Sequence, residues 1–250
     1  MATENNWLKS NIEERLTNPN AQFIVRFDHV DFTSISFTEA CKNVVNKLAA
    51  KYDNLFIPLS GGMDSEFVFN CFFEAGHKFT PIIVDTPANK EESAYAFRRC
   101  KESNITPVVI EKTETELLEL YYEEIYKKIR GIGYNATTAY LAGKYADDNG
   151  GVAIIAEHGF DGFNEHDFYN DALIHIENSV YFFMYDMQIF SAMLESYRPG
   201  ENHQIFKQKL YGIQLRPKMK YTYTEDVDKM FKQIRNNIPI PKTLVRYGTL

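Results

Sequence analysis

The chain has 250 residues, of which 44% are hydrophobic and 24% charged, and this composition is typical of a globular protein with a sizeable core. Its net charge of -7 disfavours tRNA or DNA as a substrate, because proteins that bind a polyphosphate backbone usually carry a basic face. Three separated cysteines, Cys41, Cys71 and Cys100, form no C-x-x-C pair, which argues against zinc-ribbon and iron–sulfur sites and against a disulfide framework.

The N-terminal sequence shows no targeting signal. Residues 1–6 contain no basic region followed by an apolar run, so no signal peptide is predicted. No apolar stretch approaches the roughly 20 residues that cross a bilayer. We therefore expect a cytoplasmic protein with no membrane partner.

The first segment of the chain predicts a small appendage. Residues 7–16 have a weakly helical pattern, and residues 22–37 alternate apolar and polar side chains with a turn near 28–31. Alternation of this kind is typical of a β-hairpin. We expect residues 1–37 to form an N-terminal helix and hairpin, and residues 38–250 to form the main domain.

The main domain begins with a predicted helix at Thr38, whose apolar face contains Ala40, Val44, Val45 and Leu48. Short apolar strands then alternate with helices. The predicted strands are 55–59, 81–84, 106–110 and 152–156, and the helices between them run to 73 and over 90–100, 113–128 and 135–145. This alternation predicts an α/β fold with a parallel sheet covered on both faces. Ligands of such sheets bind beyond the carboxyl ends of the strands.

The most informative motif lies between the first strand and its helix, in the string Ser60-Gly61-Gly62-Met63-Asp64-Ser65. Two glycines permit unusual backbone geometry and a close approach of an anion to the amides. The helix that follows presents N–H groups and the positive end of its dipole. Ser60 and Ser65 add hydroxyl groups, and Asp64 beside a phosphate suggests a bridging Mg²⁺. The alternative is a tight turn with Asp64 and Ser65 as helix caps.

Two common motifs are excluded at this loop. A Walker A loop would end in Lys followed by Ser or Thr, and this string lacks that ending. A nucleophile elbow needs glycine where this chain has Pro58.

The string S-G-G-M-D-S resembles the signature of the PP-loop (N-type) ATP pyrophosphatases, a superfamily that includes asparagine, GMP and NAD synthetases and tRNA-modifying enzymes. The resemblance implies a Rossmann-like (adenine nucleotide alpha-hydrolase-like) fold and cleavage of ATP between its α and β phosphates. It also implies that the loop holds pyrophosphate. Nucleotide contacts beyond the loop would come from the backbone at strand ends, at Leu59, Val84, Ala156 and Glu157.

A second polar segment, residues 157–169, follows the fourth predicted strand and contains His158 and Asp161. Its spacing matches no zinc hydrolase motif. We expect Asp161 to supply a second carboxylate for Mg²⁺, the alternative being a solvated polar loop. The segment is similar to the G-x-G-x-D-E of asparagine synthetase and beta-lactam synthetase, with Gly162 in place of Glu. By that resemblance Asp161 is the second magnesium ligand and His158 faces the substrate.

The C-terminal part resembles the same synthetase domain at residues 211–217 and 242–246. By this correspondence the chain ends before the stretch in which the synthetases carry their catalytic lysine. Replacement cations would be Arg216, Lys218, Lys220 or Lys242, near the α-phosphate. The alternative for each is an ordinary solvated surface charge.

The resemblance to the asparagine synthetase and beta-lactam synthetase domain implies an amide-forming ligase that uses ATP and Mg²⁺. Its substrate would be a small molecule with a carboxylate or amide oxygen, and a nitrogen nucleophile would displace AMP. The chain begins Met1-Ala2, so it carries no N-terminal cysteine for a glutaminase, and a separate ammonia-donating protein or free ammonia would supply the nitrogen. A homodimer is a further expectation. Two alternatives stay open: modification of a nucleobase in tRNA or DNA, and a nucleotide-binding protein without catalysis.

Overall fold

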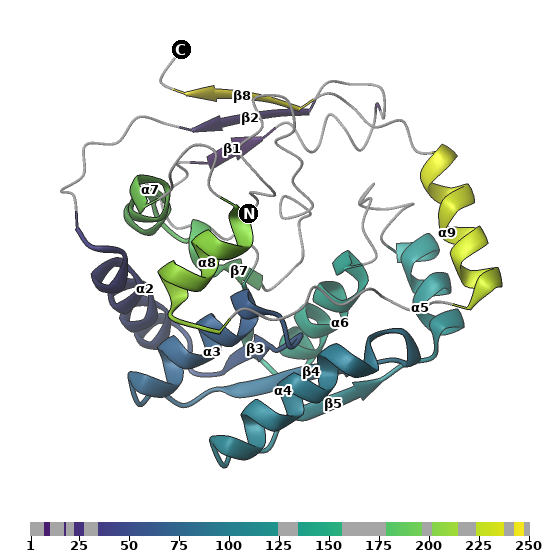
Figure 1. The fold of residues 1–250 in the computed structure, drawn as a ribbon, viewed down its shortest axis with the longest axis horizontal. Helices are drawn as coiled ribbons and strands as arrows, with labels where there is room; N and C mark the ends of the chain where they lie inside the picture. The colour runs from purple at the N-terminus through teal and green to yellow at the C-terminus, as the bar shows by residue number, and fades with distance from the viewer. Residues whose placement is uncertain are drawn as a thin grey trace.

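A computed structural model describes residues 8–10, 18, 23–27, 35–124, 135–156, 179–196, 202–214, 224–237 and 243–247. Its core is a five-stranded sheet with the strand order β5-β4-β3-β6-β7 (Figure 1). The strands are β3 (Leu55–Pro58), β4 (Thr80–Asp85), β5 (Val108–Glu111), β6 (Val152–Ile155) and β7 (Ser179–Tyr181). Every neighbouring pair in this sheet is parallel. The α/β fold with a Rossmann-like parallel sheet is therefore confirmed.

The order in which the chain adds strands to the sheet reverses beside β3. The chain runs outward from β3 through β4 to β5, and then returns to β6 and β7 on the other side of β3. Parallel strands joined by right-handed crossovers place helices on opposite faces when this direction changes. Sheets of this kind bind ligands beyond the carboxyl ends of the strands at such a reversal point, here β3 and β6.

Most of the predicted helices are present. They are α2 (Phe37–Lys51), α3 (Met63–Glu74), α4 (Lys90–Glu102), α5 (Glu114–Leu120) and α6 (Asn135–Asp148). Helix α2 begins after Ser36, whose side chain accepts a hydrogen bond from the N–H of Glu39. Its predicted apolar face, from Ala40 to Leu48, is buried in the core as expected.

Three helices of the C-terminal part were not predicted. They are α7 (Met187–Ser196), α8 (His203–Tyr211) and α9 (Glu225–Asn237). The ion pair between Lys47 and Asp186, 2.7 Å long, joins α2 to the start of α7. Glu114 accepts a hydrogen bond from the N–H of Thr224 and joins α5 to the start of α9. The C-terminal helices therefore pack against the helices around the sheet.

A second, three-stranded sheet contains β1 (Leu8–Ser10), β2 (Phe23–Phe27) and β8 (Thr243–Tyr247), and lies apart from the large sheet (Figure 1). Strand β1 runs antiparallel to β2, and β8 runs parallel to it. The weak helix predicted over residues 7–16 is wrong at 8–10, where pairing with β2 favours an extended backbone. The division into segments 1–37 and 38–250 stays a prediction. The second arm of the predicted hairpin lies largely outside the described residues.

No helix in the described part of the chain combines the length and the apolar character needed to cross a membrane.

Candidate functional site

The glycine-rich loop lies at the carboxyl end of β3, at the reversal point of the sheet. The N–H of Leu59 donates to the carbonyl oxygen of Ile82, at 2.8 Å, and extends the pairing with β4 by one residue. Because Phe56 pairs with Ala153, Leu59 and Ala156 each come three residues later on neighbouring strands. The parallel register therefore brings the predicted strand-end contacts Leu59 and Ala156 to one edge of the sheet.

Gly61 is the loop residue that no other amino acid replaces easily. Its φ of 91° is a left-handed value, and glycine reaches such values without the steric cost of a Cβ. A Cβ at this position would lie 2.0 Å from the carbonyl oxygen of Glu92, in the first turn of α4. The loop backbone thus passes directly against the backbone at the start of α4.

The two loop serines hold the turn together. The hydroxyl of Ser65 accepts a hydrogen bond from the N–H of Ser60 and donates one to the carbonyl oxygen of Gly62. The two hydroxyl oxygens are 3.0 Å apart, and the N–H of Gly62 donates to Ser60 Oγ. Ser65 is buried. These hydrogen bonds close the loop into a ring. A simple two-residue turn would not require such side-chain bonds.

The loop ends at the start of α3, with Gly62 as the N-cap. Gly62 has no side chain, and it therefore offers no capping hydrogen bond to the first turn. The first-turn N–H groups of a helix require acceptors from outside its own hydrogen-bond ladder. Together with the helix dipole, they favour an anion at this end. A 12-residue helix of this kind supports the predicted role of the loop in phosphate binding.

Asp64 is held by two side chains from α8, an arrangement that the sequence did not predict. Lys207 Nζ lies 2.7 Å from Asp64 Oδ2, and the hydroxyl of Tyr211 donates to Asp64 Oδ1 at 2.8 Å. The Lys207 side chain is only 7% exposed, whereas that of Asp64 is 30% exposed. A buried ammonium group therefore lies beside the loop carboxylate.

Aromatic packing holds α8 in this position. The ring of Tyr211 stacks on Phe67 with a centroid distance of 4.4 Å, and on Phe183 at 5.6 Å. Phe67 lies three residues after Asp64 on α3, so both side chains are on the helix face toward α8. Burial, followed by the charge of Asp64 and the hydrogen bond to it, raises the pKa of Tyr211 well above its ordinary value. The phenol therefore remains a hydrogen-bond donor to Asp64.

The described residues do not fit a magnesium ion at Asp64. Both carboxylate oxygens already accept hydrogen bonds from buried donors, and the Lys207 ammonium would repel a Mg²⁺ ion bound to the same carboxylate. Within the part of the chain that the structure describes, no group of three His, Cys, Asp or Glu side chains could hold a metal. The predicted second ligand, Asp161, lies outside the described residues.

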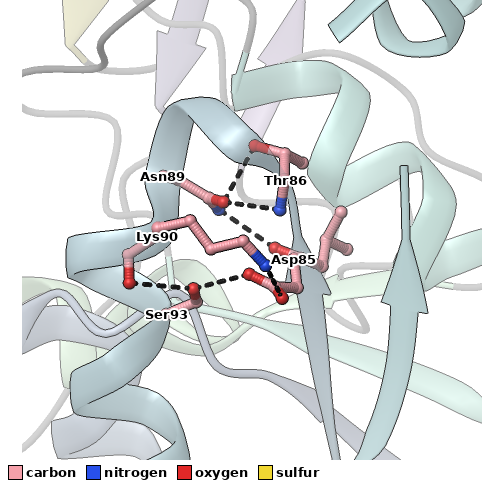
Figure 2. Close-up of polar contacts among 6 residues, drawn as sticks. Asp85, Thr86, Asn89, Lys90 and Ser93 are labelled. Carbon is pink, nitrogen blue, oxygen red and sulfur yellow. Dashed lines mark hydrogen bonds and ion pairs between the residues drawn. The ribbon is translucent and has the colours of Figure 1, made fainter. Parts of the chain in front are cut away.

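A polar cluster joins the end of β4 to the start of α4 (Figure 2). The carboxylate of Asp85 is buried and accepts hydrogen bonds from Lys90 and from Ser93, the latter at 2.8 Å. The side chain of Asn89 donates to the carbonyl oxygen of Val84 at 3.0 Å and accepts from Thr86. The cluster fixes the start of α4, whose Glu92 carbonyl touches Gly61. The Val84 carbonyl thus already accepts one hydrogen bond, and the nucleotide contact expected at Val84 stays a prediction.

The structure thus brings together Leu59, Ser60, Gly61, Gly62, Asp64, Ser65 and the strand-end residue Ala156. The other predicted site residues, Glu157, His158, Asp161, Arg216, Lys218, Lys220 and Lys242, lie outside the described residues, and their roles stay predictions.

Sequence reasoning missed Lys207 and Tyr211. The two are four residues apart on one helix, a spacing that places them on a common face. That spacing was visible in the sequence, but nothing in it indicated that this face would meet Asp64.

Neither a family model nor a curated protein sequence matches this chain. Solved structures with a similar chain path include an NMN synthetase from Francisella tularensis, which is 15% identical, with 81% of this chain and 94% of that chain covered and a TM-score of 0.41. An NH3-dependent NAD synthetase from Campylobacter jejuni is 16% identical, with 82% and 85% covered and a TM-score of 0.41. A U34-tRNA thiolase from Methanococcus maripaludis is 13% identical, with 81% and 78% covered and a TM-score of 0.40.

Likeness of this degree carries no argument about function. The functional assignment therefore rests on the loop and its surroundings, and the closeness to asparagine synthetase stays a prediction.

Proposed function

We propose that this protein is an enzyme that binds ATP at the loop of residues 60–65 and cleaves it between the α and β phosphates. One observation carries the proposal: a glycine-containing loop, held by hydrogen bonds between Ser60 and Ser65, joins the central strand β3 to the N-terminus of α3 at the reversal point of the sheet, and the N-cap Gly62 has no side chain. Such a site offers several donors to a polyphosphate and no Walker lysine to the γ-phosphate. These features favour release of the β and γ phosphates together, as pyrophosphate.

The proposed reaction has two steps. A substrate oxygen attacks the α-phosphorus, the bond from that phosphorus to the α–β bridging oxygen breaks, and pyrophosphate leaves with the bonding electrons. A nitrogen nucleophile then attacks the activated carbon. The bond from this carbon to the substrate oxygen breaks, AMP leaves with that oxygen and the bonding electrons, and the proton lost by nitrogen passes to solvent. The first-turn N–H groups of α3 would stabilise the charge that develops on departing pyrophosphate, and the serine network would hold the loop in position.

The acceptor that we favour is a small molecule with a carboxylate or amide oxygen, and the nitrogen source is ammonia or a separate ammonia-donating protein. This part of the proposal depends on the resemblance to the asparagine synthetase domain. No step is assigned to a magnesium ion on Asp64, since the described residues do not fit one. Asp161 as a metal ligand and His158 toward the substrate remain part of the proposal.

One experiment separates this function from its alternatives. The pure protein is incubated with ATP, a pool of carboxylic acids and hydroxylamine, and pyrophosphate, AMP and hydroxamates are measured. Hydroxylamine attacks an acyl adenylate as ammonia would, so an acyl-activating enzyme yields a hydroxamate that identifies the acid. A parallel reaction replaces the acids with tRNA or DNA.

Each outcome selects one function. Hydroxamate together with equal amounts of AMP and pyrophosphate supports the amide-forming ligase. Pyrophosphate release that requires the nucleic acid overturns that choice in favour of nucleobase modification. ATP binding with no pyrophosphate under any condition overturns catalysis and leaves a nucleotide-binding protein. The loop variant Ser65→Ala serves as the control for contaminating activities.

A further inference from the structure

We propose that Lys207 is the protein's own counter-ion for Asp64, so that the loop binds pyrophosphate without a magnesium ion on that carboxylate. The inference rests on the proposed function, because it concerns the same loop. It assigns to one residue of α8 the positive charge that the sequence suggested would come from a metal.

The pair lies at the N-terminus of α3. Asp64 is the second residue of α3, which begins at Met63, so its carboxylate lies beside the first-turn N–H groups that attract an anion. A carboxylate there repels a phosphate unless a cation neutralises it. Lys207 Nζ is 2.7 Å from Asp64 Oδ2, which supplies that cation from within the protein.

Lys207 is buried. The Lys207 side chain is 7% exposed, and a lysine is rarely buried to this extent unless it is paired. Removal of one partner of a buried ion pair leaves the other charge uncompensated, and this costs more than the pair itself contributes. Lys207 is therefore a fixed element of the site, in contrast to the exposed Lys209 on the same helix.

Tyr211 and the aromatic residues around it hold Asp64 in place. Tyr211 occupies the other oxygen of Asp64, at 2.8 Å, and its ring is stacked in the aromatic cluster with Phe67 and Phe183. A magnesium ion on Asp64 would lie close to a buried ammonium whose position this packing fixes, and the two cations would repel each other. The geometry favours a carboxylate that is already neutralised.

The two arrangements predict opposite effects of neutralising Asp64. If Lys207 is the counter-ion, Asp64→Asn removes a negative charge and leaves the lysine charge to attract the anion, so pyrophosphate binds as well as before or more tightly. If magnesium is the counter-ion, Asp64→Asn removes a metal ligand, so pyrophosphate binding in Mg²⁺ is lost. A merely structural role of Lys207 would not produce this difference in sign.

The experiment is calorimetric titration of inorganic pyrophosphate into wild type and variants, in EDTA and in Mg²⁺. We expect wild type to bind in EDTA, and Lys207→Met to bind about tenfold more weakly, a change that corresponds to about 1.4 kcal/mol. The double variant Asp64→Asn/Lys207→Met carries neither charge, so it should recover most of the wild-type affinity. Lys209→Met is the matched control, because it removes a lysine charge from the exposed side of the same helix.

Each possible result supports or overturns the proposed role of Lys207. Weak binding of Lys207→Met with recovery in the double variant supports the proposal, and thermal melting confirms that all variants are folded. Binding that requires Mg²⁺ and disappears in Asp64→Asn overturns it, while formation of AMP and pyrophosphate would leave the proposed function standing. If wild type binds pyrophosphate in neither buffer and releases none from ATP, the proposed function fails as well. If Lys207→Met and Lys209→Met weaken binding equally, the effect is one of overall charge and the proposal is overturned.

Discussion

Lys207 donates a hydrogen bond to Asp64 across 143 positions of sequence, from α8 to the first turn of α3. The contact joins the C-terminal part of the chain to the phosphate loop. Tyr211 adds a second bond to the same carboxylate, and its stacked ring fixes the distance between the two helices. The loop is consequently braced from α8 on one side and, through Gly61, from α4 on the other.

A first prediction concerns Gly61. Gly61→Ala should destabilise the fold by more than Gly76→Ala, because both residues have positive φ but a Cβ at Gly76 meets nothing within 4 Å. Backbone strain alone costs about 1 kcal/mol, and the collision with Glu92 adds roughly 1–3 kcal/mol. The measurement is the free energy of unfolding in denaturant, together with ATP affinity. Equal losses in the two variants would show that α4 does not press on the loop.

A second prediction concerns the serine network. Ser65→Ala removes the hydroxyl that joins Ser60 to Gly62, and we expect a loss of about 1–3 kcal/mol in stability with a larger relative loss of pyrophosphate release. The control is Ser103→Ala. Among the described residues Ser103 Oγ is buried without a hydrogen-bond partner, so its removal should be neutral or slightly stabilising. A fully active Ser65→Ala enzyme would argue against the loop as the phosphate site.

A third prediction concerns alkaline pH. The pKa of Tyr211 is raised above its unfolded value of about 10, first by burial and then by Asp64. A raised pKa contributes stability that is fully present below the unfolded pKa and is lost as the pH rises through the folded pKa. The free energy of unfolding should therefore fall more steeply above pH 10 in wild type than in Tyr211→Phe. Parallel curves for the two proteins would contradict this.

A fourth prediction concerns the cations that lie outside the described residues. We expect at least one of Arg216→Met, Lys218→Met, Lys220→Met and Lys242→Met to abolish pyrophosphate release while ATP still binds, because one cation near the α-phosphate typically contributes a few kcal/mol to the rate. Binding and turnover are measured separately for each variant. Normal turnover in all four would remove these residues from the mechanism.

The sequence predicted the features that depend on local pattern. Alternation of short apolar strands and helices gave the parallel sheet from β3 to β6, and the glycine pair placed the loop at the end of β3. These features follow from periodicity and turn chemistry, which act over a few residues.

Features that depend on distant partners were missed. The strand at Leu8–Ser10 is extended because it pairs with β2, although its own pattern was weakly helical. The pairing of Lys207 with Asp64 was missed for the same reason, since an exposed lysine and a buried lysine look alike in a sequence. Because the pair is not visible in the sequence, the sequence alone suggested Mg²⁺ as the counter-ion of Asp64.

The central claim is that ATP is cleaved between its α and β phosphates. The most direct measurement follows ATP labelled in the α-phosphate through turnover with the acceptor found by the hydroxylamine reaction, and separates the nucleotides by chromatography. The account predicts that the label appears in AMP, with pyrophosphate formed in equal amount, and that Ser65→Ala forms neither. Label in ADP, with release of orthophosphate, would contradict it.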